Sequence, residues 1–147
     1  MSPTFTASQV GEMIGIDPKV IRDWRYAGHL PFEESDRPEG QHPTFIIDQV
    51  LKLAVMVDLG ALGLSPSDTS PLAARAPAIE QIDKLDAELW VGAFTHAQSG
   101  ATPFVGRIDQ MPTDGSVVAM QVVNATAALG RIRARMSDAI EQQAPPY

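Results

Sequence analysis

The sequence has no cysteine among its 147 residues. Disulfide bonds and thiolate metal sites are therefore excluded, and the composition fits a reducing compartment. The amino-terminal residues lack the basic start and the apolar run of a secretory signal peptide, so we expect a cytoplasmic protein. The longest apolar run, residues 50–64, is interrupted by Lys52, Asp58 and glycines. It is too short and too polar to span a membrane, and we expect no membrane association.

Positive charge is also scarce. The chain has 11 Lys and Arg residues against 18 Asp and Glu residues, which gives a formal net charge of -7. Because non-specific affinity for nucleic acid comes from neutralised phosphates, this balance argues against a strong non-specific binder. Hydrophobic residues make up 44% of the chain, which is enough for a folded core. In the acidic amino-terminal part only segment 17–26 is locally basic, with Lys19, Arg22 and Arg25 against Asp17 and Asp23.

The sequence contains no pattern typical of an active site or a metal site. His29, His42 and His96 are far apart and have no cysteine partners, so we expect no metal site. No nucleophile stands beside a base, and no glycine-rich phosphate loop follows a predicted strand. We therefore expect no catalytic residues, no cofactor and no enzymatic activity.

Two short helices with clear start and stop signals are predicted near the amino-terminus. Thr6 starts a capping-box pattern at the first helix, and Gly15 ends that helix. Asp17 opens the second helix as an N-cap, with Pro18 at the first helical position, and Gly28 ends it. Two helices joined by so short a turn form a helix-turn-helix, whose second helix can enter a DNA groove.

The following residues predict a wing. Residues 29–43 are polar and rich in proline, so they form a loop, and Thr44–Ile47 has the composition of a short strand. A loop flanked by Leu30–Phe32 and this strand predicts a β-wing. Asp48 is predicted to cap a third helix, which is apolar over much of its circumference and must be buried between other elements.

These features resemble the N-terminal winged helix-turn-helix domain of MerR-type transcription regulators. The resemblance covers residues 5–64 and lies in the order and spacing of short motifs. They include Phe5-Thr6, Gly15-Ile16, Ile21-Arg22-Asp23-Trp24, Gly28-His29-Leu30-Pro31 and the wing Gly40-Gln41-His42-Pro43-Thr44-Phe45. The resemblance implies a winged helix-turn-helix domain over residues 1–64 that binds double-stranded DNA. His42 and Thr44 stand where the family has wing arginines.

Six residues are candidates for DNA contact: Lys19, Arg22, Arg25, Tyr26, Arg37 and His42. The three cations of the second helix lie at i, i+3 and i+6, and arginine suits bidentate contact with guanine. The alternative for these cations is a solvated helix face. Tyr26 has two interpretations, a phosphate contact or a cover for the turn. Arg37 and His42 either reach the DNA backbone or minor groove, or serve only the structure of an acidic loop.

The residues after 64 match no family. Residues 65–77 contain three prolines and are predicted to form a linker of short turns. A helix with an acidic outer face is expected over residues 78–89. Strands are predicted at 89–95, 104–108 and 116–123, and a final helix is predicted to start at the cap Asn124. Its three arginines, Arg131, Arg133 and Arg135, are expected to be solvated or to pair with the acidic helix.

The sequence therefore predicts an α+β protein: an N-terminal winged helix-turn-helix followed by a module of helix, about three strands and helix over residues 78–147. The module would serve dimerisation or effector binding. We expect a sequence-specific DNA-binding transcriptional regulator of bacterial or phage type. One short helix reads few base pairs, so we expect a homodimer on two half-sites, with a small-molecule or protein effector as a further partner. The alternatives are a viral or prophage DNA-processing factor, excisionase-like or small-terminase-like, and a protein-interaction module that has lost DNA binding.

Overall fold

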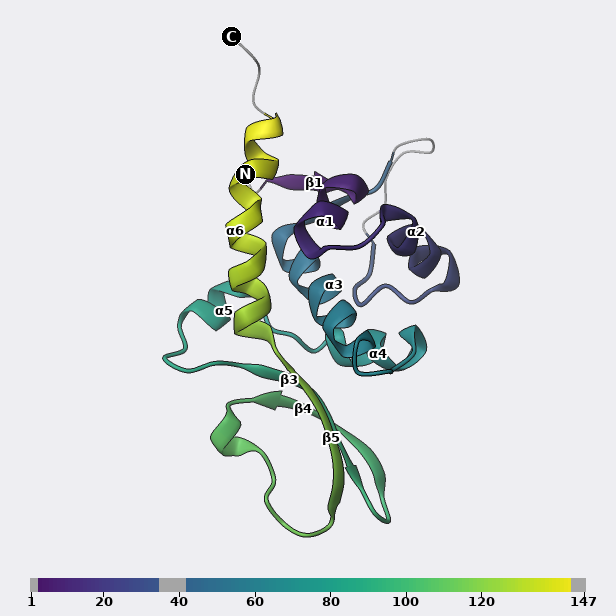
Figure 1. Cartoon of the computed structure of the whole chain (residues 1–147), viewed down its shortest axis with the longest axis vertical. Coiled ribbons are helices and arrows are strands. Elements are labelled where there is room, and N and C mark those ends of the chain that lie inside the picture. Colours follow the sequence, from purple (N-terminus) through teal and green to yellow (C-terminus); the bar gives the residue numbers. More distant parts are fainter. Residues whose placement is uncertain (1–2, 35–41, 144–147) are drawn as a thin grey trace.

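The structure, a computed structural model, describes residues 3–34 and 42–143. These residues form a mixed α+β fold with six α-helices and two small antiparallel sheets. Figure 1 shows the helices gathered at one end and the larger sheet extending away from them. In chain order the elements are β1 (Thr4–Thr6), α1 (Ala7–Ile14), α2 (Pro18–Ala27), β2 (Thr44–Ile46), α3 (Ile47–Gly60), α4 (Pro66–Ala73), α5 (Ile79–Asp83), β3 (Trp90–His96), β4 (Gly100–Gly106), a short 3-10 helix (Ile108–Gln110), β5 (Val117–Asn124) and α6 (Ala125–Gln143).

The predicted ends of the first two helices are confirmed. The backbone N–H of Gln9 donates to the Thr6 hydroxyl at 3.2 Å, and the Gln9 side chain accepts from the Thr6 N–H at 2.9 Å, which completes the capping box. Asp17 caps α2 by accepting from the Lys19 N–H at 2.9 Å. Both helices end at glycines in the left-handed region, with φ of 78° at Gly15 and 77° at Gly28.

The sheet partner of the short strand was not predicted from the sequence. Strand β2 pairs antiparallel with the amino-terminal β1, with Phe5 opposite Phe45, and not with Leu30–Phe32. The reason lies in the core, because the side chains of Phe5 and Phe45 are both fully buried and burying two aromatic rings outweighs a local hairpin. Phe32 instead contacts the Phe45 ring edge-on, at 6.0 Å between centroids.

The predicted role of Asp48 was wrong. The N-cap of α3 is Ile46, two residues before Asp48, and the Gln49 side chain accepts from the Ile46 N–H at 3.0 Å. The Asp48 carboxylate accepts from the N–H of Ile79, at the start of α5, at 3.0 Å. Asp48 therefore joins two helices that lie 31 residues apart in the sequence, a contact that a local capping rule does not anticipate.

Residues 65–77 are not a linker of turns. Helix α4 contains Pro71 in its interior, and the carboxyl end of this segment is held by Lys52. The ammonium group of Lys52 donates to the carbonyl oxygens of Ala74 and Ala76 at 2.7 and 2.6 Å. Burial lowers the pKa of Lys52 below its ordinary value, against the opposing effect of the Asp48 carboxylate. These two bonds satisfy carbonyl groups just beyond the end of α4 and join α3 to this segment.

The helix predicted over residues 78–89 ends early, at Asp83. The chain then leaves the helical course, and the N–H of Leu89 donates to the Thr126 hydroxyl at 2.9 Å. Leu89 is buried while Leu85 is 41% exposed. The residues after Asp83 therefore do not continue the predicted helix, and Leu89 is instead buried at the start of the larger sheet.

The larger sheet has the strand order β4-β3-β5 and is antiparallel throughout. The first and third predicted strands are confirmed to within one residue, and Asn124 caps α6 by accepting from the Ala127 N–H at 2.9 Å. The second strand begins at Gly100 and ends at Gly106, earlier than predicted. Ile108 is in the 3-10 helix and is 67% exposed.

A single hydrophobic core runs through the fold and crosses the predicted boundary at residue 64. Helix α6 packs against α1 and α3, and α3 in turn packs on α4 and β5 (Figure 1). The core includes Phe5, Met13, Ile21, Leu51, Val91, Leu129 and Ile132. The carboxyl-terminal helix is therefore part of the support of the amino-terminal helices. Among the residues that the structure describes, no helix has the length and the apolar character needed to cross a membrane.

Candidate nucleic-acid interface

Helix α2 has one buried face and one exposed face. Ile21 is 1% exposed, and Trp24 is half-buried against the core, in agreement with the apolar stripe in the sequence. Lys19 and Arg22 are exposed on the other side, and Tyr26 is 82% exposed. Positions i, i+3 and i+7 share one helix face, so these three side chains form a continuous outer surface, which we call the α2 face.

The turn before α2 fixes how the helix is held. A Cβ added to Gly11 would lie 2.6 Å from the carbonyl oxygen of Ile16 and 3.2 Å from Cδ of Pro18. That oxygen would then have to move, so the close approach of α1 to the turn depends on glycine. The same segment is closed by hydrogen bonds from the N–H groups of Gly15 and Ile16 to the Gly11 carbonyl oxygen, at 2.8 and 2.9 Å. The α2 face is therefore carried by a tightly packed turn.

Arg25 is not part of the α2 face. Its guanidinium forms an ion pair with Glu34, with 2.8 Å between Nε and Oε2, and the side chains are 25% and 30% exposed. Arg25 lies beside the α2 face on the helix. Its side chain is directed toward Glu34, in the loop that follows α2. Sequence reasoning missed Glu34, because the two residues are nine positions apart and no helical spacing relates them.

The two loop candidates lie in the sequence between α2 and β2. His42 is exposed in the segment before β2, and Arg37 lies outside the described residues. Lys19, Arg22 and Tyr26 are therefore exposed on one side of the helix, while Arg25 pairs with Glu34 and its guanidinium carbon lies 6.0 Å from the centroid of the Tyr26 ring.

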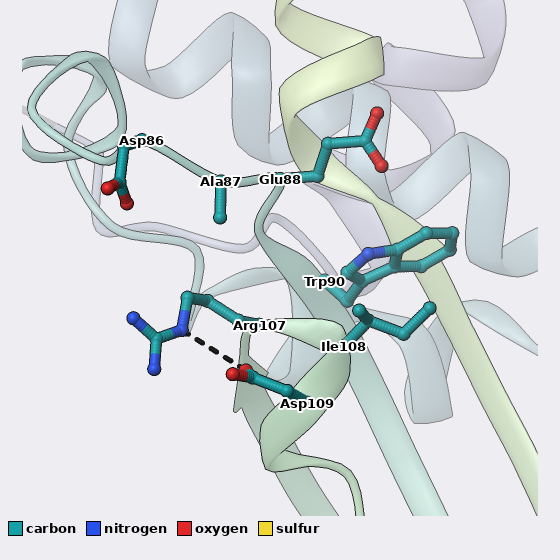
Figure 2. A pocket seen from close by; sticks show the side chains of 7 residues that line it. All are labelled: Asp86, Ala87, Glu88, Trp90, Arg107, Ile108 and Asp109. Atoms are coloured by element: carbon teal, nitrogen blue, oxygen red, sulfur yellow. Dashed lines mark hydrogen bonds and ion pairs between the residues drawn. The ribbon is translucent and has the colours of Figure 1, made fainter.

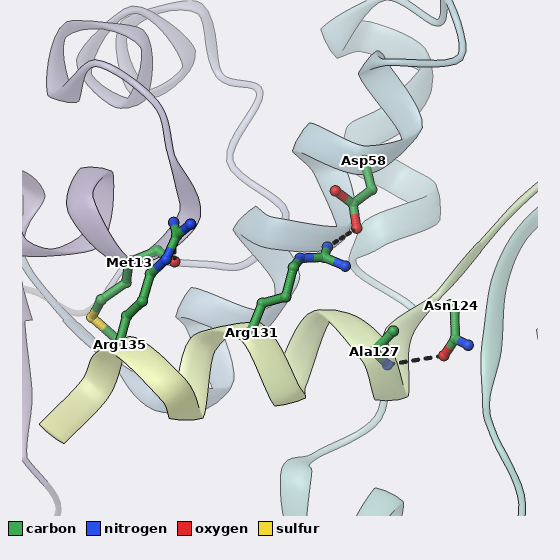
Figure 3. Close-up of polar contacts among 6 residues, drawn as sticks. All are labelled: Met13, Asp58, Asn124, Ala127, Arg131 and Arg135. Atoms are coloured by element: carbon green, nitrogen blue, oxygen red, sulfur yellow. Dashed lines mark hydrogen bonds and ion pairs between the residues drawn. The ribbon is translucent and has the colours of Figure 1, made fainter.

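The arginines of α6 tie that helix to three other elements; Figure 3 shows Arg131 beside Asp58 and Arg135 beside Met13. Arg131 pairs with Asp58 of α3, with 2.5 Å between Nη2 and Oδ2. Arg133 forms two hydrogen bonds to Asp83 of α5, at 2.8 and 2.6 Å, which confirms the expected pairing with the acidic helix. These bonds hold the pKa of the Asp83 carboxyl below its ordinary value.

Arg135 contacts the carboxyl end of α1. One guanidinium nitrogen, Nη1, donates to the carbonyl oxygens of Glu12 and Met13 at 3.2 and 3.4 Å. The last carbonyls of a helix lack partners within the helix and carry partial negative charge, so a cation there is stabilising. Helix α1 precedes the turn that carries α2, so α6 supports the α2 face indirectly. Charge spacing within α6 alone does not reveal this contact.

A cavity of about 430 Å³ opens at the start of the larger sheet (Figure 2). Its lining contains the Trp90 ring and more acidic than basic groups, and Arg107 pairs with Asp109 at 3.2 Å. The buried indole N–H of Trp90 has no hydrogen-bond partner among the described residues. The lining residues are Asp86, Ala87, Glu88, Trp90, Arg107, Ile108 and Asp109.

Neither the models of known protein families nor the curated proteins give a significant match to this sequence. Function must therefore be argued from the geometry of the chain itself.

Proposed function

We propose that the protein is a sequence-specific DNA-binding regulator, in which α1 and α2 act as the helix-turn-helix of a winged domain similar to that of MerR-type regulators. One observation carries the proposal: a short, capped helix held by its opposite face presents Lys19, Arg22 and Tyr26 together to solvent. A helix in this setting can enter the major groove while its partner helix crosses the backbone.

The three side chains of the α2 face suit different parts of DNA. A guanidinium such as that of Arg22 can form two parallel hydrogen bonds to the O6 and N7 atoms of guanine. Lys19 lies near the amino-terminal end of α2, where N–H groups also attract a phosphate. The Tyr26 hydroxyl can donate to a phosphate oxygen. One such face reads only a few base pairs, so the proposal includes a homodimer that places two copies of α2 on two half-sites.

Replacing Arg22 with alanine should weaken specific DNA binding by about 1–3 kcal/mol if the guanidinium contacts a base edge. Folding should be unaffected because the side chain is exposed. Fluorescence anisotropy measures the binding of the protein to a selected operator sequence. The matched control is Arg75→Ala, which removes an exposed arginine beyond the end of α4 and should leave affinity unchanged. Equal affinities for wild type and Arg22→Ala would refute the assignment of the α2 face.

Glu34→Gln should strengthen DNA binding by about 1 kcal/mol, because it releases Arg25 from its ion pair and removes one negative charge. Glu33→Gln is the control, since Glu33 is exposed and its replacement removes the same charge without releasing Arg25. A larger gain for Glu34→Gln than for Glu33→Gln, in the same anisotropy assay, assigns the effect to Arg25. Equal gains would mean that only the net charge matters.

The salt dependence of binding should be shallow. Few cations are available, so the slope of log affinity against log salt concentration should be about −2 to −5 per dimer. Titrations at several salt concentrations measure it. A slope near −10, which corresponds to many neutralised phosphates, would mean that cations outside the α2 face contribute most of the DNA contact.

A protein-interaction module that uses the same face is the second candidate. The net charge of -7 and the ion pair of Arg25 favour it, because both reduce attraction to phosphates. An exposed tyrosine beside an arginine is also typical of protein interfaces. Absence of any sequence preference in a binding selection from random DNA at low salt would decide for this candidate.

A further inference from the structure

Strand β5 forms an open edge of the larger sheet. The strand order β4-β3-β5 leaves β5 with one partner, and nothing else in residues 3–34 and 42–143 pairs with its outer side as a strand. Figure 1 shows the sheet extending beyond the helices. The side chains of Val118 and Met120, in the outer half of β5, are 63% and 53% exposed. A free edge of this kind offers unpaired N–H and C=O groups to another strand.

The two edges of the sheet differ in composition. Strand β4 contains Pro103, which blunts an edge because proline cannot donate to a neighbouring strand. Strand β5 has the sequence VVAMQVVN, with no proline and no charged residue. Lysine, proline and short length are among the usual protections of an edge, and this eight-residue strand has none of these three. A register shift opposite Thr95 and His96 interrupts the strand at Val118, so the regular part of the edge begins at Ala119. Its composition is that of a strand that receives a partner.

The hydrogen-bond pattern shows which groups point outward. The N–H of Ala125 donates to the Leu89 carbonyl oxygen at 2.8 Å. Antiparallel pairs alternate between bonded and non-bonded positions, so in the register of β3 and β5 the backbone groups of Met120 and Val122 point away from β3. The same alternation places the nitrogen of Pro103 on the outer side of β4, where its missing N–H costs nothing.

We propose that β5 pairs antiparallel with β5 of a second copy of this chain, across a two-fold axis, to form one continuous sheet. An antiparallel edge is complementary to itself, because each strand offers the same outward donors and acceptors to the other. Two molecules of net charge -7 repel each other, but β5 has no charged residue, so the two copies meet along a part of the surface where this repulsion is not concentrated. The pairing also covers the exposed side chains of Val118 and Met120.

The interface does not depend on the proposed function. Molar mass is measured without DNA, so failure of this dimer and failure of DNA binding by the α2 face are separate results. If both hold, the two-fold axis through the paired β5 strands relates the two copies of α2.

Multi-angle light scattering over a concentration series tests the pairing with the full chain. The wild type should have the mass of a dimer, and Met120→Lys should halve it, because two lysines meet at the paired edges. Ala101→Lys is the matched control, since Ala101 is exposed on the opposite edge strand β4, and it should remain a dimer. Circular dichroism checks that each variant is folded. A monomeric wild type at every concentration, or a dimeric Met120→Lys, overturns the proposal.

A cross-linking test locates the axis. The chain has no native cysteine, so single cysteines at Ala119, Met120 or Gln121 report only on contacts between copies. Residues opposite each other across the axis come close enough for a disulfide, so mild oxidation should give a covalent dimer for at least one of these variants. Ala101→Cys should remain uncoupled. Cross-linking of Ala101→Cys with none at positions 119–121 would place the interface on the other edge and overturn the assignment of β5.

Discussion

Replacing Gly92 with alanine should destabilise the protein by about 3 kcal/mol, through overpacking against backbone that cannot move freely. Gly92 lies opposite Val122 in the pairing of β3 with β5. A Cβ at this position would overlap the Gln121 carbonyl oxygen and lie 2.7 Å from the Cα of Val122. Both atoms belong to the backbone of β5, so the central and edge strands would have to separate.

The control for Gly92→Ala is Gly130→Ala. Gly130 is exposed in α6, and nothing lies within 4 Å of an added Cβ. Alanine is the better helix former, so this variant should gain about 0.5–1 kcal/mol. Urea denaturation followed by circular dichroism measures both variants. A Gly92→Ala protein as stable as the wild type would show that β5 can shift away from β3 without loss.

Truncating Ile132 to alanine should cost about 2–5 kcal/mol and should destabilise both ends of the chain together. The Ile132 side chain is 1% exposed and belongs to the core that also contains Met13 and Ile21. The cavity left behind would lie among helices from both halves of the sequence. We therefore expect one unfolding transition for the whole protein.

The two tryptophans of the chain make this test direct. Trp24 is in α2 and Trp90 is in β3. Trp90→Phe leaves Trp24 as the sole fluorescence reporter, and Trp24→Phe leaves Trp90. With and without Ile132→Ala, the two reporters should give coincident denaturation curves. Two separate midpoints would instead support independent domains with a boundary near residue 64.

Local signals in the sequence predicted both ends of α1 and α2 and the cap of α6, but not the start of α3 or the end of α5. A capping box such as Thr6 with Gln9, or a glycine such as Gly15 in the left-handed region, is decided by residues within one helical turn. Strand partners are decided by distant residues. Phe45 pairs with a strand some forty residues earlier because both rings enter the same core, and no periodicity in the sequence encodes that choice.

In the candidate site too, positions along one helix were predictable from the sequence and contacts between elements were not. Lys19 and Arg22 were placed on one exposed helix face by their spacing in the sequence. Arg25 was expected on the same side, but it pairs with Glu34, and the position of Tyr26 beside Lys19 and Arg22 was not anticipated. Their contact with DNA remains a prediction. The pairing of Arg25 with Glu34 and the contact of Arg135 with α1 depend on how loops and helices pack. Electrostatic partners across tertiary distances are set by the completed fold, and charge counts along the chain do not identify them.

Three strands of this protein run directly into helices without a connecting loop. β1 continues into α1, β2 into α3, and β5 into α6. At each junction a side chain ties the backbone: Gln9 and Thr6 at the first, Gln49 at the second and Asn124 at the third. Hinge motion needs residues that are free to change φ and ψ, and these junctions supply none. A change in the angle between α1, α3 or α6 and the strand that precedes it must therefore break hydrogen bonds, which makes it a local unfolding event with the corresponding free-energy cost.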